Sequence, residues 1–176
     1  MRLDSYTRNT REASEMNEIA FGNATMFRYA CDTLVDKMNQ GFSESGSTVR
    51  QEEAKLKQSL VVPVIVNASF ACELFLKSLL PSNTHGHELD ELFSKLDQDM
   101  QNEIMSWTGL TMKCSNPAYN MEQFYQDLKN NSNDFAAWRY FHEGHNLEAN
   151  LQFLLTFLNV LNRVALNQKS QENSSN

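Results

Sequence analysis

The chain contains few of the residues that interrupt helices, with six glycines and three prolines among 176 residues. So few helix-breaking residues indicate long helices joined by a small number of turns. Its three cysteines, Cys31, Cys72 and Cys114, stand far apart and form no CxxC, which excludes a disulfide framework and favours a reducing compartment. The longest apolar run, 60–66, is far shorter than the roughly 20 residues of a membrane-spanning helix. We therefore expect a cytoplasmic protein that does not enter a membrane.

Basic side chains are also scarce. Lys and Arg number 15 against 22 Asp and Glu, which gives a net charge of -7 and a pI near 5.1. This balance argues against broad, sequence-independent binding of nucleic acid, which requires many cations against phosphates, but it leaves room for a small local site. Between His87 and Glu103, six carboxylates accompany the single Lys95. We expect this run to be a solvated helix face, and the alternative is a docking surface for a basic partner.

Apolar residues recur at intervals of three and four along most of the chain, which predicts amphipathic helices. Long helices are expected over 11–40, over 49–80 and from Asn146 onward. Gly41 is expected to cap the first helix, and Pro63 to kink or split the second. Shorter helices are expected around residues 88–96, 102–110 and 121–129.

No alternation typical of strands, no internal repeat and no interdomain linker interrupts this pattern. We therefore predict an all-α bundle of about four main helices with short accessory ones. One domain is expected over residues 11–167, preceded by a tail at 1–10. The polar residues 168–176 are expected to form a disordered tail.

The histidines raise the question of a metal site. His85 and His87 form an HxH in a loop, and Cys114, His142 and His145 follow later in the chain. No spacing among them matches a zinc finger, and HxH alone is a weak signal, so no metal ligand is assigned. His87 is expected instead to begin the short helix that follows it.

Glu73 and Lys77 lie four residues apart, in the order that favours a salt bridge on a helix. Because their helix is otherwise apolar, we expect the pair to form its polar stripe. The alternative is that Lys77 faces a polar cleft and contacts a substrate there.

The segment 135–145, FAAWRYFHEGH, brings an arginine close to two histidines. In a continuous helix Arg139 and Glu143 would lie about 40° apart, which suits an ion pair, whereas Arg139 and His145 would lie about 120° apart. If the helix breaks at Gly144, His145 turns back toward Arg139. His142 competes with His145 as the reactive imidazole.

Three segments in order, ACELFLKSLL, HGHELDELFSKL and WRYFHEGH, followed by a last amphipathic helix, resemble the HEPN superfamily. The resemblance covers roughly residues 50–165. It implies a four- to five-helix up-and-down bundle and a homodimer. It further implies a metal-independent endoribonuclease of a toxin–antitoxin or other defence system. The family's signature is an arginine followed after four to six residues by a histidine, and Arg139 and His145 match it with five residues between them.

What the resemblance implies about the site is chemically reasonable. A histidine that titrates near neutrality can move the proton of a ribose 2′-hydroxyl, and a guanidinium can hold the phosphate. The catalytic candidates are Arg139, His145 and His142, and Lys77 and Tyr140 are the candidates for substrate binding. Neither a metal nor a cofactor is implied; the implied partners are a second copy, an RNA or nucleotide, and an antitoxin or other protein.

Two further functions stay open. The WRY--E form of the motif also resembles HEPN-like proteins in which the arginine and glutamate, here Arg139 and Glu143, form a structural pair. Such a protein would be a non-catalytic helical module that binds a nucleotide, RNA or a partner protein. A purely structural dimer would show a large apolar interface and no polar cleft.

Overall fold

The computed structural model describes residues 16–44, 51–139 and 149–175. Within these ranges every regular element is a helix, which confirms the all-α prediction. The helices are α1 (Glu18–Glu44), α2 (Gln51–Gln58), α3 (Val61–Ser78), α4 (Leu89–Ser94), α5 (Gln98–Lys113), α6 (Met121–Asn130), α7 (Asp134–Arg139) and α8 (Leu151–Ser175).

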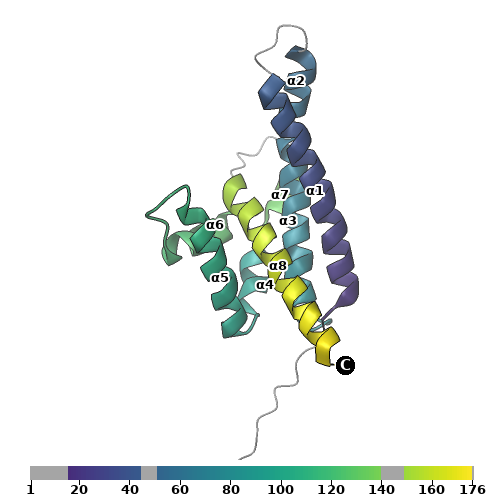
Figure 1. The fold of residues 1–176 in the computed structure, drawn as a ribbon, viewed down its shortest axis with the longest axis vertical. Helices are drawn as coiled ribbons and strands as arrows, with labels where there is room; N and C mark the ends of the chain where they lie inside the picture. The colour runs from purple at the N-terminus through teal and green to yellow at the C-terminus, as the bar shows by residue number, and fades with distance from the viewer. Residues whose placement is uncertain (1–15, 45–50, 140–148, 176) are drawn as a thin grey trace, which may run out of the picture.

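The long helices α1, α3 and α8 lie side by side, and α5 and α6 lie on the other side of α8 (Figure 1). Helix α2 packs on the C-terminal part of α1 and extends with it beyond the rest of the bundle. The short helices α4 and α7 both pack against α3. Helix α3 is therefore the central element, which α1, α4, α7 and α8 all contact.

Helix α3 has the burial expected of a central helix, and its fully enclosed side chains include Val64, Phe75 and Leu76. The stretch Glu52–Ser78 is long and apolar enough to cross a membrane by length and composition, yet half of its most apolar window is buried inside the fold. The core helix of a soluble protein has the same composition, and the packing of α3 is compatible with that role.

Pro63 lies in the first turn of α3, after a break of two residues that separates this helix from α2. Proline is tolerated there because the first backbone N–H groups of a helix have no intrahelical acceptor. Of the two predicted outcomes, a kink or a split, the structure has the split.

Gly41 does not cap α1, contrary to prediction, because the helix continues through it to Glu44. A Cβ at this position would lie 2.5 Å from Cβ of Lys57 and 2.9 Å from the carbonyl oxygen of Ala54. The glycine thus lets α2 approach the backbone of α1, a tertiary requirement that a helix-end rule does not detect.

The C-terminal residues 168–175, for which a disordered tail was predicted, belong to α8. Glu172 accepts a hydrogen bond from the backbone N–H of Met16 at 3.1 Å, and Lys169 pairs with Glu18 at 2.7 Å. These contacts tie the last turns of α8 to the start of α1, which explains why a polar segment is helical there.

Candidate functional site

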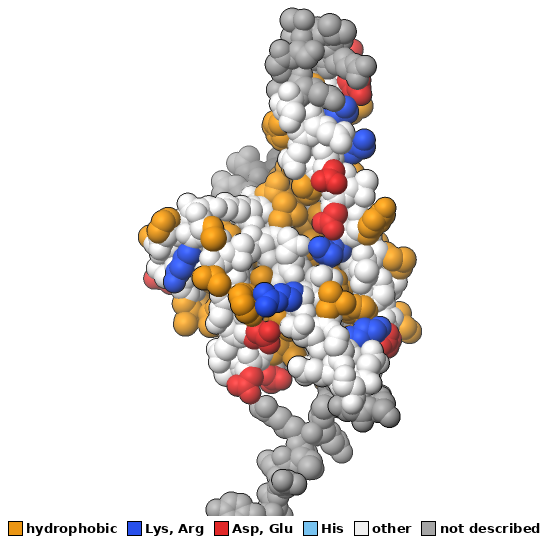
Figure 2. All heavy atoms as spheres, viewed as in Figure 1, with side chains coloured by type: hydrophobic (Ala, Val, Ile, Leu, Met, Phe, Trp, Pro, Cys, Tyr) orange, Lys and Arg blue, Asp and Glu red, His pale blue; other side chains and the backbone are white. Residues whose placement is uncertain are grey.

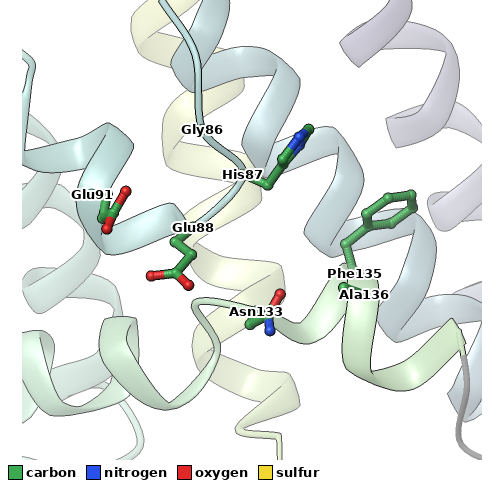
Figure 3. A pocket seen from close by; sticks show the side chains of 7 residues that line it. All are labelled: Gly86, His87, Glu88, Glu91, Asn133, Phe135 and Ala136. Carbon is green, nitrogen blue, oxygen red and sulfur yellow. The ribbon is translucent and has the colours of Figure 1, made fainter.

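A pocket of about 520 Å³ lies where the turn before α4 meets α7. Gly86, His87, Glu88 and Glu91 form one wall, and Asn133, Phe135 and Ala136 form the other. Figure 3 shows the His87 and Phe135 rings on one side, the two carboxylates on the opposite side, and Asn133 between them. The pocket therefore combines a ring-lined part with a part rich in hydrogen-bond acceptors.

Behind this pocket, a buried carboxylate on α3 joins two of the segments that sequence analysis singled out. Glu73 is only 2% exposed, and its Oε1 accepts a hydrogen bond from Nζ of Lys77 at 2.7 Å. The same oxygen lies 2.9 Å from Nδ1 of His87, whose side chain is 76% exposed. Oε2 of Glu73 has no hydrogen-bond partner among the described residues. The expected Glu73–Lys77 pair is thus present, and it includes His87 as a third member.

The turn that presents His87 depends on Gly86, whose φ of +118° lies in the region that L side chains rarely adopt. Lys95 of the α4 C-terminus donates from Nζ to the carbonyl oxygen of His85 at 2.9 Å, which closes the turn. His87 precedes α4 and does not begin it, since Glu88 occupies the N-cap position.

Ser132 fixes the two walls of the pocket to each other. Its carbonyl oxygen accepts from the backbone N–H of Leu89 at 3.1 Å, and its hydroxyl oxygen accepts from the backbone N–H of Asp90 at 3.1 Å. The same hydroxyl donates to the carboxylate of Asp90. Because Ser132 directly precedes the pocket residue Asn133, these bonds set the position of α7 relative to α4.

Helix α7 packs on the middle of α3. The ring of Phe135 stacks on that of Phe70 with a centroid distance of 4.4 Å and an interplanar angle of 17°. The rings of Phe70 and of Phe27 on α1 are in a T-shaped contact, with their centroids 4.6 Å apart. Lys77 lies about two helical turns beyond Phe70, at the C-terminal end of α3. The structure therefore brings Lys77 to Glu73 and His87, while α7 contacts an earlier part of α3.

Asp134, the first residue of α7, is 4% exposed and carries an oxygen, Oδ2, without a hydrogen-bond partner among the described residues. Burial raises the pKa of its carboxyl to about 7, and the neighbouring Trp138 partly opposes this increase. The cause is desolvation, which penalises the charged form. A carboxylic acid that is partly protonated at neutral pH thus lies within the helix that forms one wall of the pocket.

Most of the predicted catalytic candidates lie outside the described residues. Arg139 is the last residue of α7, one turn after Ala136, and its side chain is outside the description. Tyr140, His142, Glu143, Gly144 and His145 all fall in the range 140–148, which is not described. The Arg139–His145 and Arg139–Glu143 pairs, and the bend at Gly144, remain predictions.

The start of α8, which was predicted near Asn146, is at Leu151, and a hydrogen-bond network fixes it. Asn150 caps the helix by accepting from the backbone N–H of Phe153 at 3.1 Å, and its amide donates to Oδ1 of Asp127 at 2.9 Å. Its own N–H donates to Oδ1 of Asn131 at 3.1 Å, and the hydroxyl of Tyr119 donates to Oδ2 of Asp127 at 3.0 Å. Burial and the bond to Asp127 raise the pKa of Tyr119.

No role in a functional site was expected for Asn133 or Phe135, and His87 was expected to begin a helix. One signal was present for His87, since a histidine directly after a glycine in a turn is easily exposed. Nothing in the sequence indicated that His87 would meet Glu73, because 14 residues and a turn separate them.

The charges around the pocket limit what it can hold. Glu88 and Glu91 contribute two carboxylates, while Glu73 is balanced by Lys77. No group of three or more His, Cys, Asp or Glu side chains suited to a metal ion occurs within the described part of the chain. The groups available to a ligand are thus hydrogen-bonding side chains and an aromatic ring. No family model, curated protein or solved structure matches this chain.

Proposed function

We propose that the chain is a HEPN-like helical protein that acts on RNA as a metal-independent endoribonuclease. One observation supports this proposal most. The first two segments that carry the resemblance meet in space, since Glu73, which is paired with Lys77 in the first, lies 2.9 Å from Nδ1 of His87 in the second. Phe135 and Ala136 of α7, the helix that ends in Trp138 and Arg139 at the start of the third segment, line the pocket beside His87. Two weak motifs support the resemblance more strongly when their residues are bonded to each other in the fold.

In the proposed reaction, the guanidinium of Arg139 holds the scissile phosphate and stabilises the charge that develops on it. The imidazole of His145, or of His142, takes the proton of the ribose 2′-hydroxyl as that oxygen attacks phosphorus. The bond from phosphorus to the 5′-oxygen of the next nucleotide breaks, that oxygen leaves as a hydroxyl after taking a proton from an imidazole or from water, and a 2′,3′-cyclic phosphate remains. Lys77 and Tyr140 are the proposed substrate contacts, of which Lys77 is already paired with Glu73.

RNA contact in this proposal is local. The net charge is -7, and Figure 2 shows the Lys and Arg side chains of one face scattered among Asp and Glu instead of gathered in a patch. Affinity for RNA should therefore depend on few phosphate contacts and fall only weakly with added salt.

Incubation of purified protein with total RNA and a chelator tests the activity. We expect cleavage by the wild type, and loss of cleavage in Arg139→Ala and in His145→Ala or His142→Ala. Melting temperatures of all variants show whether a loss reflects unfolding. Absence of cleavage by the wild type, or equal cleavage by all four proteins, would refute the ribonuclease proposal.

The second candidate is a non-catalytic module that binds a nucleotide, RNA or partner protein. The observation that favours its partner-protein form is the pair of carboxylates, Glu88 and Glu91, at the pocket, because they repel a phosphate placed beside them. This candidate predicts a pairing of Arg139 with Glu143. In that case Arg139→Ala lowers the melting temperature although the wild type cleaves no RNA.

A homodimer is part of the proposal, as is a protein partner such as an antitoxin. Support for a partner surface comes from α1, where Ile19, Met26 and Tyr29 are 79%, 62% and 75% exposed. Large apolar side chains exposed along one helix are typical of an interaction surface. Light scattering of the wild type and of Met26→Glu tests this, and a wild-type monomer at all concentrations contradicts the dimer.

A further inference from the structure

We propose that the pocket between the 86–88 turn and α7 binds the nucleoside part of a ribonucleotide, and that Nε2 of His87 accepts a hydrogen bond from it. The inference rests on the proposed action on RNA, and it names the part of the substrate that this pocket takes.

The tautomer of His87 follows from its partner. Oε1 of Glu73 already accepts from Lys77, and an ionised carboxylate can only accept hydrogen bonds. The short contact with Nδ1 of His87 therefore requires a proton on Nδ1. In the neutral ring Nε2 then carries a free lone pair. Since the Nδ1 edge faces Glu73 and the side chain is 76% exposed, the accepting edge of the ring is presented to the outside.

The other polar groups of the pocket are also mainly acceptors. The carboxylates of Glu88 and Glu91 accept only, and the amide of Asn133 both donates and accepts. A ligand that satisfies these groups must supply O–H or N–H donors and carry no negative charge at this point. A phosphate is negatively charged and does not meet this requirement, whereas a ribose hydroxyl or the exocyclic amino group of a base does.

The remaining lining is suited to a flat ring. Phe135 and Ala136 present apolar surface from α7, and Phe135 is held in place by its stacking on Phe70. A volume of about 520 Å³ is within the range of small-molecule sites. Splayed-out bases in RNA-binding proteins are held in this way, against an aromatic ring and by hydrogen bonds along one edge.

The charged groups around His87 are few. Glu73 and Lys77 face it from α3, Glu88 and Glu91 lie beside it at the start of α4, and the pocket residues of α7 are uncharged. Lys95 adds a positive charge, but its ammonium donates to the carbonyl oxygen of His85 at 2.9 Å. A guanidinium from a basic peptide is the competing ligand, because it is flat and rich in donors. The size of the pocket favours the larger nucleoside.

Two variants separate a binding role of His87 from a structural one. In His87→Asn the amide nitrogen takes the place of Nδ1 and preserves the bond to Glu73, but the Nε2 acceptor is lost. In His87→Gln a polar group is retained near Nε2, but the bond to Glu73 is lost. We expect His87→Asn to melt like the wild type and His87→Gln to melt at a lower temperature.

The binding experiment is an NMR titration of the full chain with cytidine, adenosine, uridine and agmatine. We expect cytidine and adenosine to shift the His87 ring resonances, and His87→Asn to weaken their binding about tenfold, which corresponds to the loss of one hydrogen bond. Uridine, which lacks an exocyclic amino group, should bind more weakly. Tighter binding of agmatine than of the nucleosides, or unchanged nucleoside binding by His87→Asn, would overturn the inference.

This outcome is distinguishable from failure of the ribonuclease proposal. Nucleoside binding that depends on His87, together with no cleavage of RNA, supports the pocket and refutes only the catalysis. Cleavage of RNA with no nucleoside binding refutes only the pocket.

Discussion

Two carboxylates, Asp127 and Glu73, each join segments that are distant in the sequence, and they do so in different ways. Asp127 uses both oxygens, one for the hydroxyl of Tyr119 and one for the amide of Asn150. Glu73 uses one oxygen for both Lys77 and His87, and its other oxygen has no partner among the described residues. Both carboxylate oxygens of Asp127 are therefore bonded within its network, whereas the Glu73 cluster includes the exposed imidazole of His87.

The difference follows from burial. Asp127 is only partly buried, so neutral donors and water suffice to solvate its charge. Glu73 is 2% exposed, and a charge at such a depth requires a counter-ion, which Lys77 provides. A network that closes on itself stabilises the fold, while one that reaches the surface through a histidine can also act on a ligand.

The largest effect is expected for Glu73→Ala, which removes the centre of the buried cluster. Loss of one member of a buried ion pair should lower the free energy of unfolding by about 3–5 kcal/mol, as measured by urea denaturation. The matched control is Glu53→Ala, because Glu53 forms an i,i+4 pair with Lys57 but is 52% exposed. That change should cost no more than about 0.5 kcal/mol. Equal costs for the two variants would contradict the importance of burial.

A smaller effect is expected for Asp127→Ala, which leaves the donors of Tyr119 and Asn150 unpaired. The free energy of unfolding should fall by about 2–3 kcal/mol, and Tyr119→Phe alone should cost about 1 kcal/mol. A double-mutant cycle measures their coupling. If the network is only structural, the folded Asp127→Ala protein binds cytidine as the wild type does. Weaker cytidine binding by Asp127→Ala, under conditions in which the variant is fully folded, would contradict the distinction between the two regions.

Asp134→Asn is the one change expected to stabilise the protein, and it tests a residue of the pocket wall instead of the Glu73 cluster. Burial holds the pKa of Asp134 at about 7 in the folded chain, above the usual 3.8 of an aspartate. The folded state therefore binds this proton more tightly, and the wild type loses stability as pH rises from about 4 to about 7.

Asparagine resembles the protonated acid and does not titrate. The variant should accordingly gain about 4 kcal/mol over the wild type at pH about 8, and almost nothing at pH about 4. Denaturation curves of both proteins across this range measure the difference. A difference that is independent of pH would show that Asp134 has an ordinary pKa.

Much of the fold follows from local patterns. Apolar residues at helical spacing predicted the helices that became α1, α3, α5, α6 and α8, and the position of Pro63 predicted an interruption before α3. The boundaries were less predictable. Gly41 resembles a helix end in sequence but lies inside α1, because its role is set by the approach of Lys57 and Ala54.

Less of the site could be predicted. The Glu73–Lys77 pair followed from spacing alone, since side chains four residues apart on a helix are always neighbours. The inclusion of His87 could not follow, because the turn around Gly86 had to bring it back to α3. The contribution of Asn133 and Phe135 depended likewise on the bonds of Ser132 to α4.

The sequence by itself determined the helical class, the order of the helices and the salt bridge within α3, because these depend on interactions within a few residues of each other. The tertiary structure decided which polar groups are buried, which are hydrogen-bonded to partners and which line a pocket. Those properties depend on the free energy of placing a charge away from water. Only the packing of distant segments fixes that energy, as the approach of the His87 turn to Glu73 shows.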